Sequence, residues 1–333
     1  MNILVTGATG FIGSHTCVSL LEEGHNVIAF DNFYNSKESV IDKIKKLSGK
    51  DFVFYNADMT DKSAMQNIFD KHEIDCVIHF AGYKAVGESV HIPLSYYHNN
   101  IYGTLCLLDV MKSNNVKRII FSSSATVYGN PASLPIKEDF PLSATNPYGR
   151  TKLMIEDILR DLWISDNEWS IILLRYFNPV GAHKSGLLCE DPKGIPNNLM
   201  PRLLDVAFGK TREITVFGDD YNTKDGTGVR DYIHVVDLAF GHVKAVDYAM
   251  NNKCVEAINL GTGIGYSVFD LIHTLEKVND ISVPFKICPR RPGDIDACYA
   301  DPTKANDLLG WSAELNLEDM CKDAYFASKL ARD

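Results

Sequence analysis

The sequence predicts an α/β protein with a doubly wound parallel sheet of the Rossmann type, followed by a smaller mixed α/β domain. Short apolar strands alternate with amphipathic helices through the first half of the chain. A glycine-rich turn directly follows the first of these strands. After residue 178 the alternation weakens, and proline and glycine become denser. In a chain of 333 residues, this pattern favours one domain over residues 1–177 and a second over residues 178–333.

The strands and helices of the first domain are predicted from the periodicity of apolar residues and from the turn-forming residues between them. Continuous apolar runs of this length are typical of strands buried on both faces of a parallel sheet. Strands are predicted at 2–5, 26–31, 52–59, 76–82, 118–125 and 169–178, and intervening helices at 11–24, 39–47 and 63–72. In the second domain, the main segments are 197–209, 213–218 and 285–294. A strongly helical segment near 232–250 is expected to return to the first domain.

Composition and charge exclude several classes of protein. The formal net charge is −10, so a basic surface for nucleic acid is not expected. The eight cysteines are scattered, with neither a CxxC pair nor zinc-ligand spacing. This pattern favours reduced thiols in the cytoplasm and no metal site. No secretory leader and no apolar stretch long enough to span a membrane is recognised, so no membrane partner is expected.

The turn after the first strand has the features of a dinucleotide site. Its sequence, GATGFIG, places Gly7, Gly10 and Gly13 at GxxGxxG spacing, which lets the backbone approach a pyrophosphate at a helix N-terminus. Asp31 ends the second strand, where a carboxylate receives ribose hydroxyls and repels a 2′-phosphate, so NAD is favoured over NADP. The alternative is that Asp31 only caps the following turn. Asp58 is a weaker candidate for contact with the adenine.

A tyrosine and a lysine four residues apart form the candidate catalytic pair. Tyr148 and Lys152 in NPYGRTK share one helix face. A lysine ammonium and the helix N-terminus, with a bound nicotinamide cation, would favour the phenolate and make Tyr148 a base. Ser124, at the end of an upstream strand, is placed to bond the same substrate oxygen. The alternative for the pair alone is an aromatic ring packed on a lysine stem.

These motifs resemble those of the extended short-chain dehydrogenase/reductase superfamily, and within it the UDP-glucose 4-epimerase family. The resemblance covers nearly the whole chain and includes VTGATGFIGSHT, DNFYNSK, HFAGYKAVGESV, FSSSATVYG, NPYGRTK, LLRYFNPVGAH, GIPNNLMP, DGTGVRDYIHV, NLGTG and RRPGD. It implies an NAD site in the first domain. Besides the glycines, Tyr148 and Lys152, the implied cofactor residues are Phe11, Ile12, Asp31, Asn32, Phe33, Tyr34, Asn35, Ser36, Asp58, Met59, Phe80, Ala81, Gly82, Lys84, Asn99 and Phe177. From the residues alone, Lys84 would be a solvated loop lysine.

The resemblance also implies a UDP-sugar site built mainly by the second domain. The implied substrate residues are Ser124, Asn178, Asn198, Leu199, Thr215, Val216, Phe217, Arg230, Arg291, Asp294 and Cys298. Guanidinium groups suit bidentate binding of a diphosphate, and the segment 215–217 can offer backbone groups to uracil as a strand edge. The alternative for both arginines is ordinary surface ion pairing.

The activity that the resemblance implies is reversible inversion of the sugar at C4 by transient oxidation with tightly bound NAD. The 4-keto sugar would turn about its link to the diphosphate before it is reduced from the other face. A dehydratase or decarboxylase on the same fold is the alternative. Dehydration needs a further acid–base pair after Ser124, and Ala125 and Thr126 stand there instead. A non-catalytic NAD-sensing protein would not need Tyr148 and Lys152.

Two further expectations follow from the resemblance. Cys298 stands where some members have a tyrosine that walls off the 2-position of the sugar, so its small size predicts room for an N-acetyl group and activity on UDP-GlcNAc and UDP-GalNAc. The alternative is that Cys298 is a small buried hydrophobe. The family also implies a homodimer formed through helices near 93–112 and 149–163.

Overall fold

The structure is a computed structural model that describes residues 1–194, 196–291 and 294–332. Its centre is a parallel sheet of seven strands in the order β10-β6-β5-β4-β1-β2-β3. The strands are β1 Asn2–Thr6, β2 Asn26–Asp31, β3 Val53–Asn56, β4 Cys76–His79, β5 Arg118–Ser124, β6 Ser170–Tyr176 and β10 Val255–Leu260. The strand order reverses at β1, between β2 and β4. In such sheets ligands bind outside the carboxyl ends of the strands at that point.

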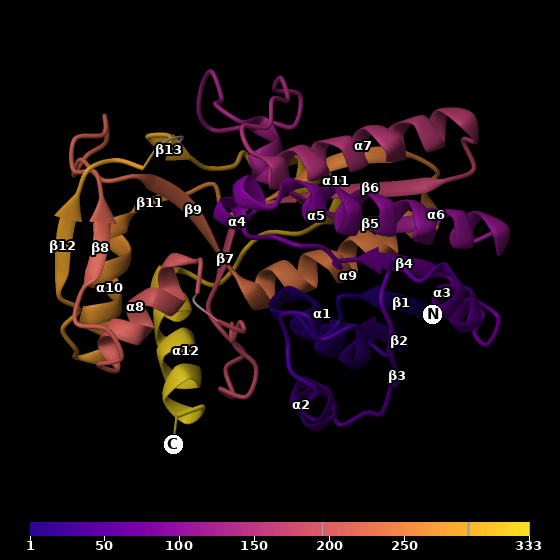
Figure 1. The fold of residues 1–333 in the computed structure, drawn as a ribbon, viewed down its shortest axis with the longest axis horizontal. Coiled ribbons are helices and arrows are strands. Elements are labelled where there is room, and N and C mark those ends of the chain that lie inside the picture. Colours follow the sequence, from indigo (N-terminus) through magenta and orange to yellow (C-terminus); the bar gives the residue numbers. More distant parts are fainter. Residues whose placement is uncertain (195, 292–293, 333) are drawn as a thin grey trace.

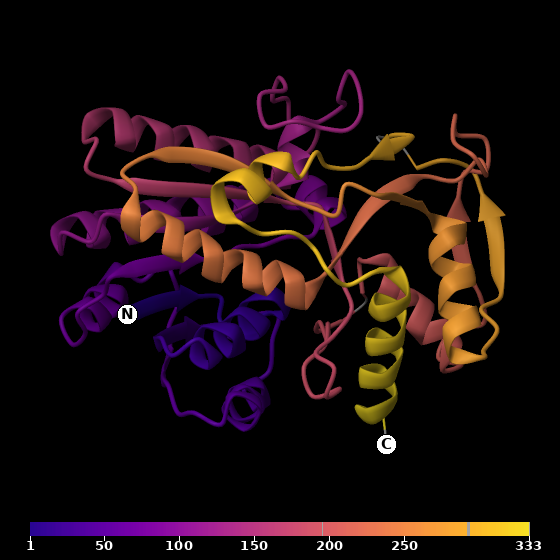
Figure 2. The same cartoon turned by 180° about the vertical axis from the view of Figure 1, so that it is seen from behind.

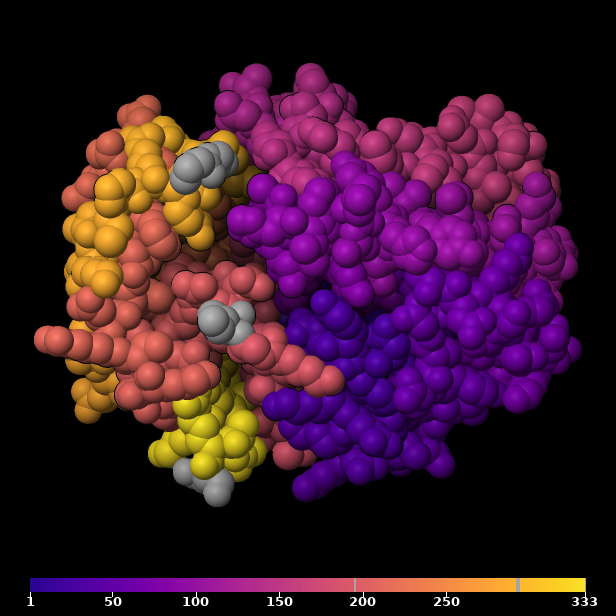
Figure 3. Space-filling model, viewed as in Figure 1, coloured from indigo at the N-terminus to yellow at the C-terminus, as the bar shows by residue number. Residues whose placement is uncertain are grey.

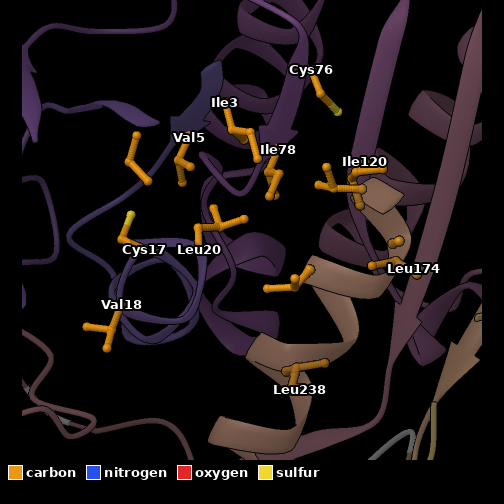
Figure 4. Packing of buried hydrophobic residues seen from close by; sticks show 14 of the residues in the cluster. Ile3, Val5, Cys17, Val18, Leu20, Cys76, Ile78, Ile120, Leu174 and Leu238 are labelled. Atoms are coloured by element: carbon orange, nitrogen blue, oxygen red, sulfur yellow. The ribbon is translucent and has the colours of Figure 1, made fainter. Parts of the chain in front are cut away.

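Helices cover both faces of this sheet, as predicted for a doubly wound fold (Figure 1). One face packs on α1 Phe11–Glu22, α2 Ser39–Ser48, α9 Val235–Asn251 and α11 Thr303–Leu309. The other face packs on α3 Lys62–Phe69, α6 Gly103–Ser113 and α7 Pro147–Ser165. Alternate residues of each strand serve opposite faces. In β1, Ile3 and Val5 point toward α1 and α9, where Figure 4 shows them near Leu20, while Leu4 belongs to the other core.

The second half of the chain builds a smaller lobe beside the sheet (Figure 2). Strand β9 Val229–His234 joins β7 Asn178–Val180, β11 Gly265–Ser267 and β13 Ala297–Cys298 in one sheet. A parallel pair is formed by β8 Ile214–Phe217 and β12 Phe285–Cys288. Helices α8 Leu199–Ala207, α10 Val268–Asn279 and α12 Leu317–Leu330 complete a core of their own. The segment near 232–250 is α9, which packs on α1, and the following β10 enters the large sheet, which periodicity did not indicate.

Short helical segments surround the region between the two halves. They are α4 Val86–His91, α5 Pro93–Tyr96, the π-helical turn η1 Tyr97–Tyr102 and the 3₁₀ turn η2 Ala125–Tyr128. Figure 3 shows a hollow between the first half of the chain, indigo to magenta, and the salmon and orange second half. Within the described residues, no helix is long and apolar enough to span a membrane, and no three His, Cys, Asp or Glu side chains gather as a metal-binding group.

Candidate active site

The turn between β1 and α1 leaves no room for side chains at two of its glycines. Gly7 has φ +68°, and a Cβ on it would lie 2.7 Å from the backbone nitrogen of Ala81. A Cβ on Gly13 would lie 2.3 Å from the carbonyl oxygen of Gly7. Helix α1 begins at Phe11 after Gly10, which has no side chain to cap the first N–H groups. This bare helix N-terminus at the switch point fits a pyrophosphate.

Asp31 supports this turn and also caps the next one. Its Oδ2 accepts a hydrogen bond from the backbone nitrogen of Thr9 at 3.1 Å, which ties the end of β2 to the glycine turn. Its Oδ1 accepts from the backbone nitrogen of Phe33 at 2.8 Å, so the capping role considered above is present too. The carboxylate therefore lies beside the glycine turn, and a ribose bound to this carboxylate would lie there too.

A cavity of about 430 Å³ opens beside α5 and η1, next to the segments that follow β3 and β4. It is lined by Asp58, Thr60, Tyr83, Leu94, Ser95, His98 and Asn99. Asp58 Oδ2 accepts from Asn32 Nδ2 at 2.7 Å, which joins two of the predicted cofactor residues. Partial burial raises the pKa of Asp58, but hydrogen bonds from Thr60 and Asn32 outweigh it and hold the pKa below its usual value. The cavity thus has an ionised carboxylate at its wall.

Helix α7 presents Tyr148 and Lys152 near the end of β5. Asn146 caps this helix by accepting from the backbone nitrogen of Gly149 at 2.8 Å, and Pro147 occupies its first turn. Lys152 is 5% exposed, and its Nζ donates to the carbonyl oxygen of Ser122 at 2.6 Å. The same Nζ lies 6.0 Å from the centre of the Tyr148 ring. Burial lowers the pKa of Lys152 to about 7.

Without a bound cofactor, the surroundings of Tyr148 favour the neutral phenol. Burial raises the pKa of Tyr148, and a side-chain hydrogen bond to Ser124 offsets only part of this effect. Lys152, whose own charge is disfavoured by burial, does not reverse the balance. The further groups that would favour the phenolate are the N-terminus of α7 and a nicotinamide cation in the cofactor site. The proton acceptor is therefore expected to form only in the loaded site.

The three serines at the end of β5 make different contacts. The carbonyl oxygen of Ser122 holds Lys152, and Ser123 Oγ donates to Glu156 Oε1 at 2.5 Å. Ser124 Oγ accepts a hydrogen bond from Thr126 Oγ1 at 3.0 Å. The hydroxyl proton of Ser124 is thereby directed toward Tyr148. Glu156 was missed by the sequence analysis. Its place four residues after Lys152, on the face that carries the catalytic pair, is the signal that could have identified it.

The predicted nucleotide residues of the second domain fall into two groups. At the end of β8, Arg291 Nε donates to Asp294 Oδ2 at 2.9 Å, and the guanidinium lies 5.0 Å from the centre of the Phe217 ring. Arg230 in β9 donates to the carbonyl oxygen of Ile295 at 3.0 Å, which brings it to the same loop. Thr215, Val216 and Phe217 lie in β8, which pairs with β12 along one edge.

The second group stands nearer the cofactor site. Asn198 precedes α8, and its Nδ2 donates to Glu190 Oε1 at 2.6 Å. Lys84 Nζ, from the first domain, lies 3.1 Å from the same oxygen. Asn178 begins β7, and Leu199 begins α8. Glu190 is a second residue that the sequence analysis missed, because nothing in the local pattern of its loop shows which residues it meets.

Cys298 ends β13, opposite Arg230 of β9. It packs against a buried cluster that includes Val127 and Phe177, next to the 3₁₀ turn after Ser124. The neighbouring Tyr299 points elsewhere, since a Cβ on Gly265 would lie 3.0 Å from its Cδ1. Tyr299 therefore does not take the place that Cys298 leaves small.

Comparison with known proteins agrees with this geometry. A family model described as GDP-mannose 4,6 dehydratase matches residues 4–324. A UDP-glucose 4-epimerase of Bacillus subtilis is 59% identical over 325 residues, which are 98% of this chain and 96% of that protein. This chain belongs to the UDP-glucose 4-epimerase family. A member of the family from Dictyostelium discoideum is 54% identical over 97% of this chain and 94% of its own length.

Solved structures of the family share the whole fold. The UDP-glucose 4-epimerase of Bifidobacterium longum, in complex with NAD⁺ and UDP, has a TM-score of 0.97 and 54% identity, over 100% of this chain and 99% of that one. The enzyme of Stenotrophomonas maltophila, with bound NAD and formylated UDP-arabinopyranose, has a TM-score of 0.98 and 48% identity over the same shares. The Rossmann-type fold class predicted from the sequence is confirmed.

A single methyl group in the glycine turn is expected to disturb the cofactor site. In Gly13→Ala, the new Cβ would meet the Gly7 carbonyl, so the turn must move, at a cost of about 1–3 kcal/mol in the free energy of unfolding. NAD retained through purification should fall with it. Gly87→Ala is the control, because a Cβ at Gly87 meets nothing within 4 Å. Equal NAD content and equal urea midpoints in both variants would contradict the role given to the turn.

Proposed function

We propose that this protein interconverts UDP-glucose and UDP-galactose by inverting the sugar at C4 with a tightly retained NAD. The observation that carries the proposal is the meeting of Tyr148, Ser124 and Lys152 at the end of β5, in the same sheet as the bare glycine turn after β1, together with family membership. NAD held at the glycine turn and by Asp31 would supply reversible hydride transfer to and from C4. The dehydratase alternative is not favoured, because Ala125 and Thr126 supply no acid–base pair.

The residues of the chain handle the proton and hold the nucleotide. Tyr148 takes the proton of the 4-hydroxyl and later returns it, and Ser124 bonds the same oxygen. Arg230 and Arg291 anchor the diphosphate, while Phe217 and the open edge of β8 receive the uracil. A firmly held UDP with few fixed contacts to the sugar allows the 4-keto sugar to turn. The remaining cofactor and substrate residues named above complete the two sites in this proposal.

The two-domain division is part of the same proposal. Residues 1–177 form the NAD-binding domain, to which α9, α11 and β10 return, and the rest of 178–333 forms the UDP-sugar domain. The separate cores of the sheet and of the smaller lobe support this division.

The direct test is to incubate the purified protein with each of the four UDP-sugars and no added NAD. Interconversion of UDP-glucose and UDP-galactose, followed by chromatography, is the expected result. It would establish retained cofactor and redox-neutral chemistry together. Release of a dehydrated or decarboxylated product would support the alternative reactions, and absence of turnover despite bound NAD would favour a non-catalytic role.

The size of Cys298 supports a broader substrate range. Cys298 packs against the buried cluster that includes Phe177, and Tyr299 points away, so one small side chain occupies this position. We expect Cys298→Tyr to lower the activity on UDP-GlcNAc and UDP-GalNAc at least tenfold, with activity on the plain sugars largely kept. The ratio of the two kcat/KM values is the measurement. An unchanged ratio would leave Cys298 as a small hydrophobe with no part in selectivity.

A cytoplasmic homodimer is also proposed. The helices η1, α6 and α7, of which α6 and α7 each contact η1, carry exposed apolar side chains, namely Tyr102, Leu105, Met154 and Ile164. All eight cysteines are free thiols, as suits the cytoplasm. We expect Leu105→Arg to convert dimer to monomer in light scattering, because it places a charge within the apolar patch. Ile264→Arg, at another exposed apolar position, should leave the mass unchanged. A monomeric unchanged protein would contradict this assignment.

A further inference from the structure

Glu190 connects the two halves of the site through a single oxygen atom. It lies between β7 and α8, and its side chain is 10% exposed. Its Oε1 accepts from Asn198 Nδ2 at 2.6 Å and lies 3.1 Å from Lys84 Nζ. Lys84 comes from the first domain, and Asn198 stands at the start of α8 in the second. One carboxylate therefore contacts a candidate cofactor residue and a candidate nucleotide residue.

The carboxylate fixes which atom Asn198 offers to the site. An ionised carboxylate can only accept hydrogen bonds, so the amide nitrogen of Asn198 must face it. The amide oxygen then points elsewhere. Asn198 also makes no side-chain cap to α8, although asparagine is well suited to that position. The bond to Glu190 thus takes the place of a helix cap, and it leaves the amide oxygen free to accept from a ligand.

The same carboxylate holds a half-exposed lysine. Half of the Lys84 side chain is exposed, and a lysine side chain loses rotamer entropy when it is held. The contact with Glu190 supplies part of that ordering before any ligand arrives. The neighbouring residues of this loop also contact the first domain. Asp191 pairs with Lys37, and the backbone nitrogen of Lys193 donates to Asn35 Oδ1 at 3.0 Å.

We propose that Glu190 is a positioning residue that orients Lys84 toward the cofactor and Asn198 toward the nucleotide sugar. The inference rests on the proposed function, because that function gives Lys84 and Asn198 their ligands. Removal of the Glu190 carboxylate should therefore weaken the binding of both NAD and UDP. Removal of Lys84 alone should affect only NAD, and removal of Asn198 alone should affect only the nucleotide.

The experiment measures NAD release and UDP binding separately, on the holoprotein. Released NAD is trapped by an NAD-consuming enzyme, and UDP affinity is measured by calorimetry. We expect Glu190→Ala to speed NAD release and to weaken UDP binding, each about tenfold, as for loss of a hydrogen bond to a charged group. Glu190→Gln keeps the acceptor oxygen but removes the charge, so UDP affinity should stay near that of the unchanged protein while NAD release still quickens.

Double variants show whether Glu190 acts through its two partners. In a Lys84→Ala background, Glu190→Ala should not speed NAD release further. In an Asn198→Ala background, it should not weaken UDP binding further. Asp191→Ala is the control for the loop, and both readouts should remain within about twofold, because its pair with Lys37 is exposed.

Additive effects in the two double variants would overturn the proposal, as would equal effects of Glu190→Gln on both ligands. If Glu190→Ala does not fold, the same cycles are read with Glu190→Gln for NAD release. A protein that binds NAD and UDP but does not interconvert UDP-sugars would contradict the proposed function. The binding cycles would still decide the role of Glu190.

Discussion

Tyr148→Phe is expected to lower kcat by about three orders of magnitude while leaving the binding of NAD and UDP largely intact. The range for loss of a positioned acid–base group is about 10²–10⁴. The phenol is the group that both Ser124 and the end of β5 position, and burial keeps it neutral in the protein alone. Phenylalanine keeps the ring and its packing, so the loss should appear in kcat and only weakly in KM.

The control is Tyr325→Phe, since Tyr325 stacks on Phe208 in the second core, away from the catalytic pair. Its kcat should not change. NAD content and UDP affinity should match in all three proteins. Normal epimerisation by Tyr148→Phe would remove the basis of the mechanism, whatever the family of the chain.

Arg175→Met is expected to destabilise the protein by about 3 kcal/mol, the lower end of the range for a broken buried pair, because Glu156 then keeps only the more exposed Arg160, at 3.2 Å, as a cationic partner. Arg175 and Glu156 are 1% and 0% exposed, and they form two hydrogen bonds of 3.0 and 2.6 Å. Arg175 also donates to the hydroxyl oxygen of Tyr128 at 2.9 Å. The pair ties α7, which carries Tyr148 and Lys152, to β6, so activity at 37 °C should fall with stability.

Urea unfolding of three variants shows how much of the lost stability is due to the unpaired charge and how much is due to lost packing. The double variant Glu156→Gln, Arg175→Met should recover much of the lost stability, since no unpaired charge stays buried. The exposed pair of Lys277 and Glu318 is the control, and Lys277→Met should barely move the midpoint. If Arg175→Met unfolded at the same urea concentration as the unchanged protein, the pair would have no part in holding α7.

The sequence predicted the layers of the fold and the catalytic face of α7, because both depend on local periodicity. Apolar runs defined the strands, and the four-residue spacing placed Tyr148 and Lys152 together. Contacts between distant segments did not follow in this way. Glu190 meets Lys84 only because β7 and α8 bring its loop to the first domain. Likewise, β10 looks like any buried strand, and its place at the edge of the large sheet depends on the return of α9.

The protonation state of Tyr148 likewise could not be predicted from local sequence spacing. Its pKa depends on how deeply the ring and Lys152 are buried, and the spacing of the two residues carries no information about burial. The spacing did not indicate that burial lowers the pKa of Lys152 to about 7 and raises that of Tyr148. The position of Ser124 at a strand end indicated a residue of the site, but it did not indicate the hydrogen bond with Thr126.

The most direct test of the central claim is the fate of the hydrogen at C4. UDP-galactose labelled with deuterium at C4 is converted by the purified protein in ordinary water, without added NAD. We expect UDP-glucose that keeps the deuterium at C4, because the same hydrogen leaves and returns within one site. Loss of the label to water, or its appearance on another carbon, would contradict oxidation and reduction at C4.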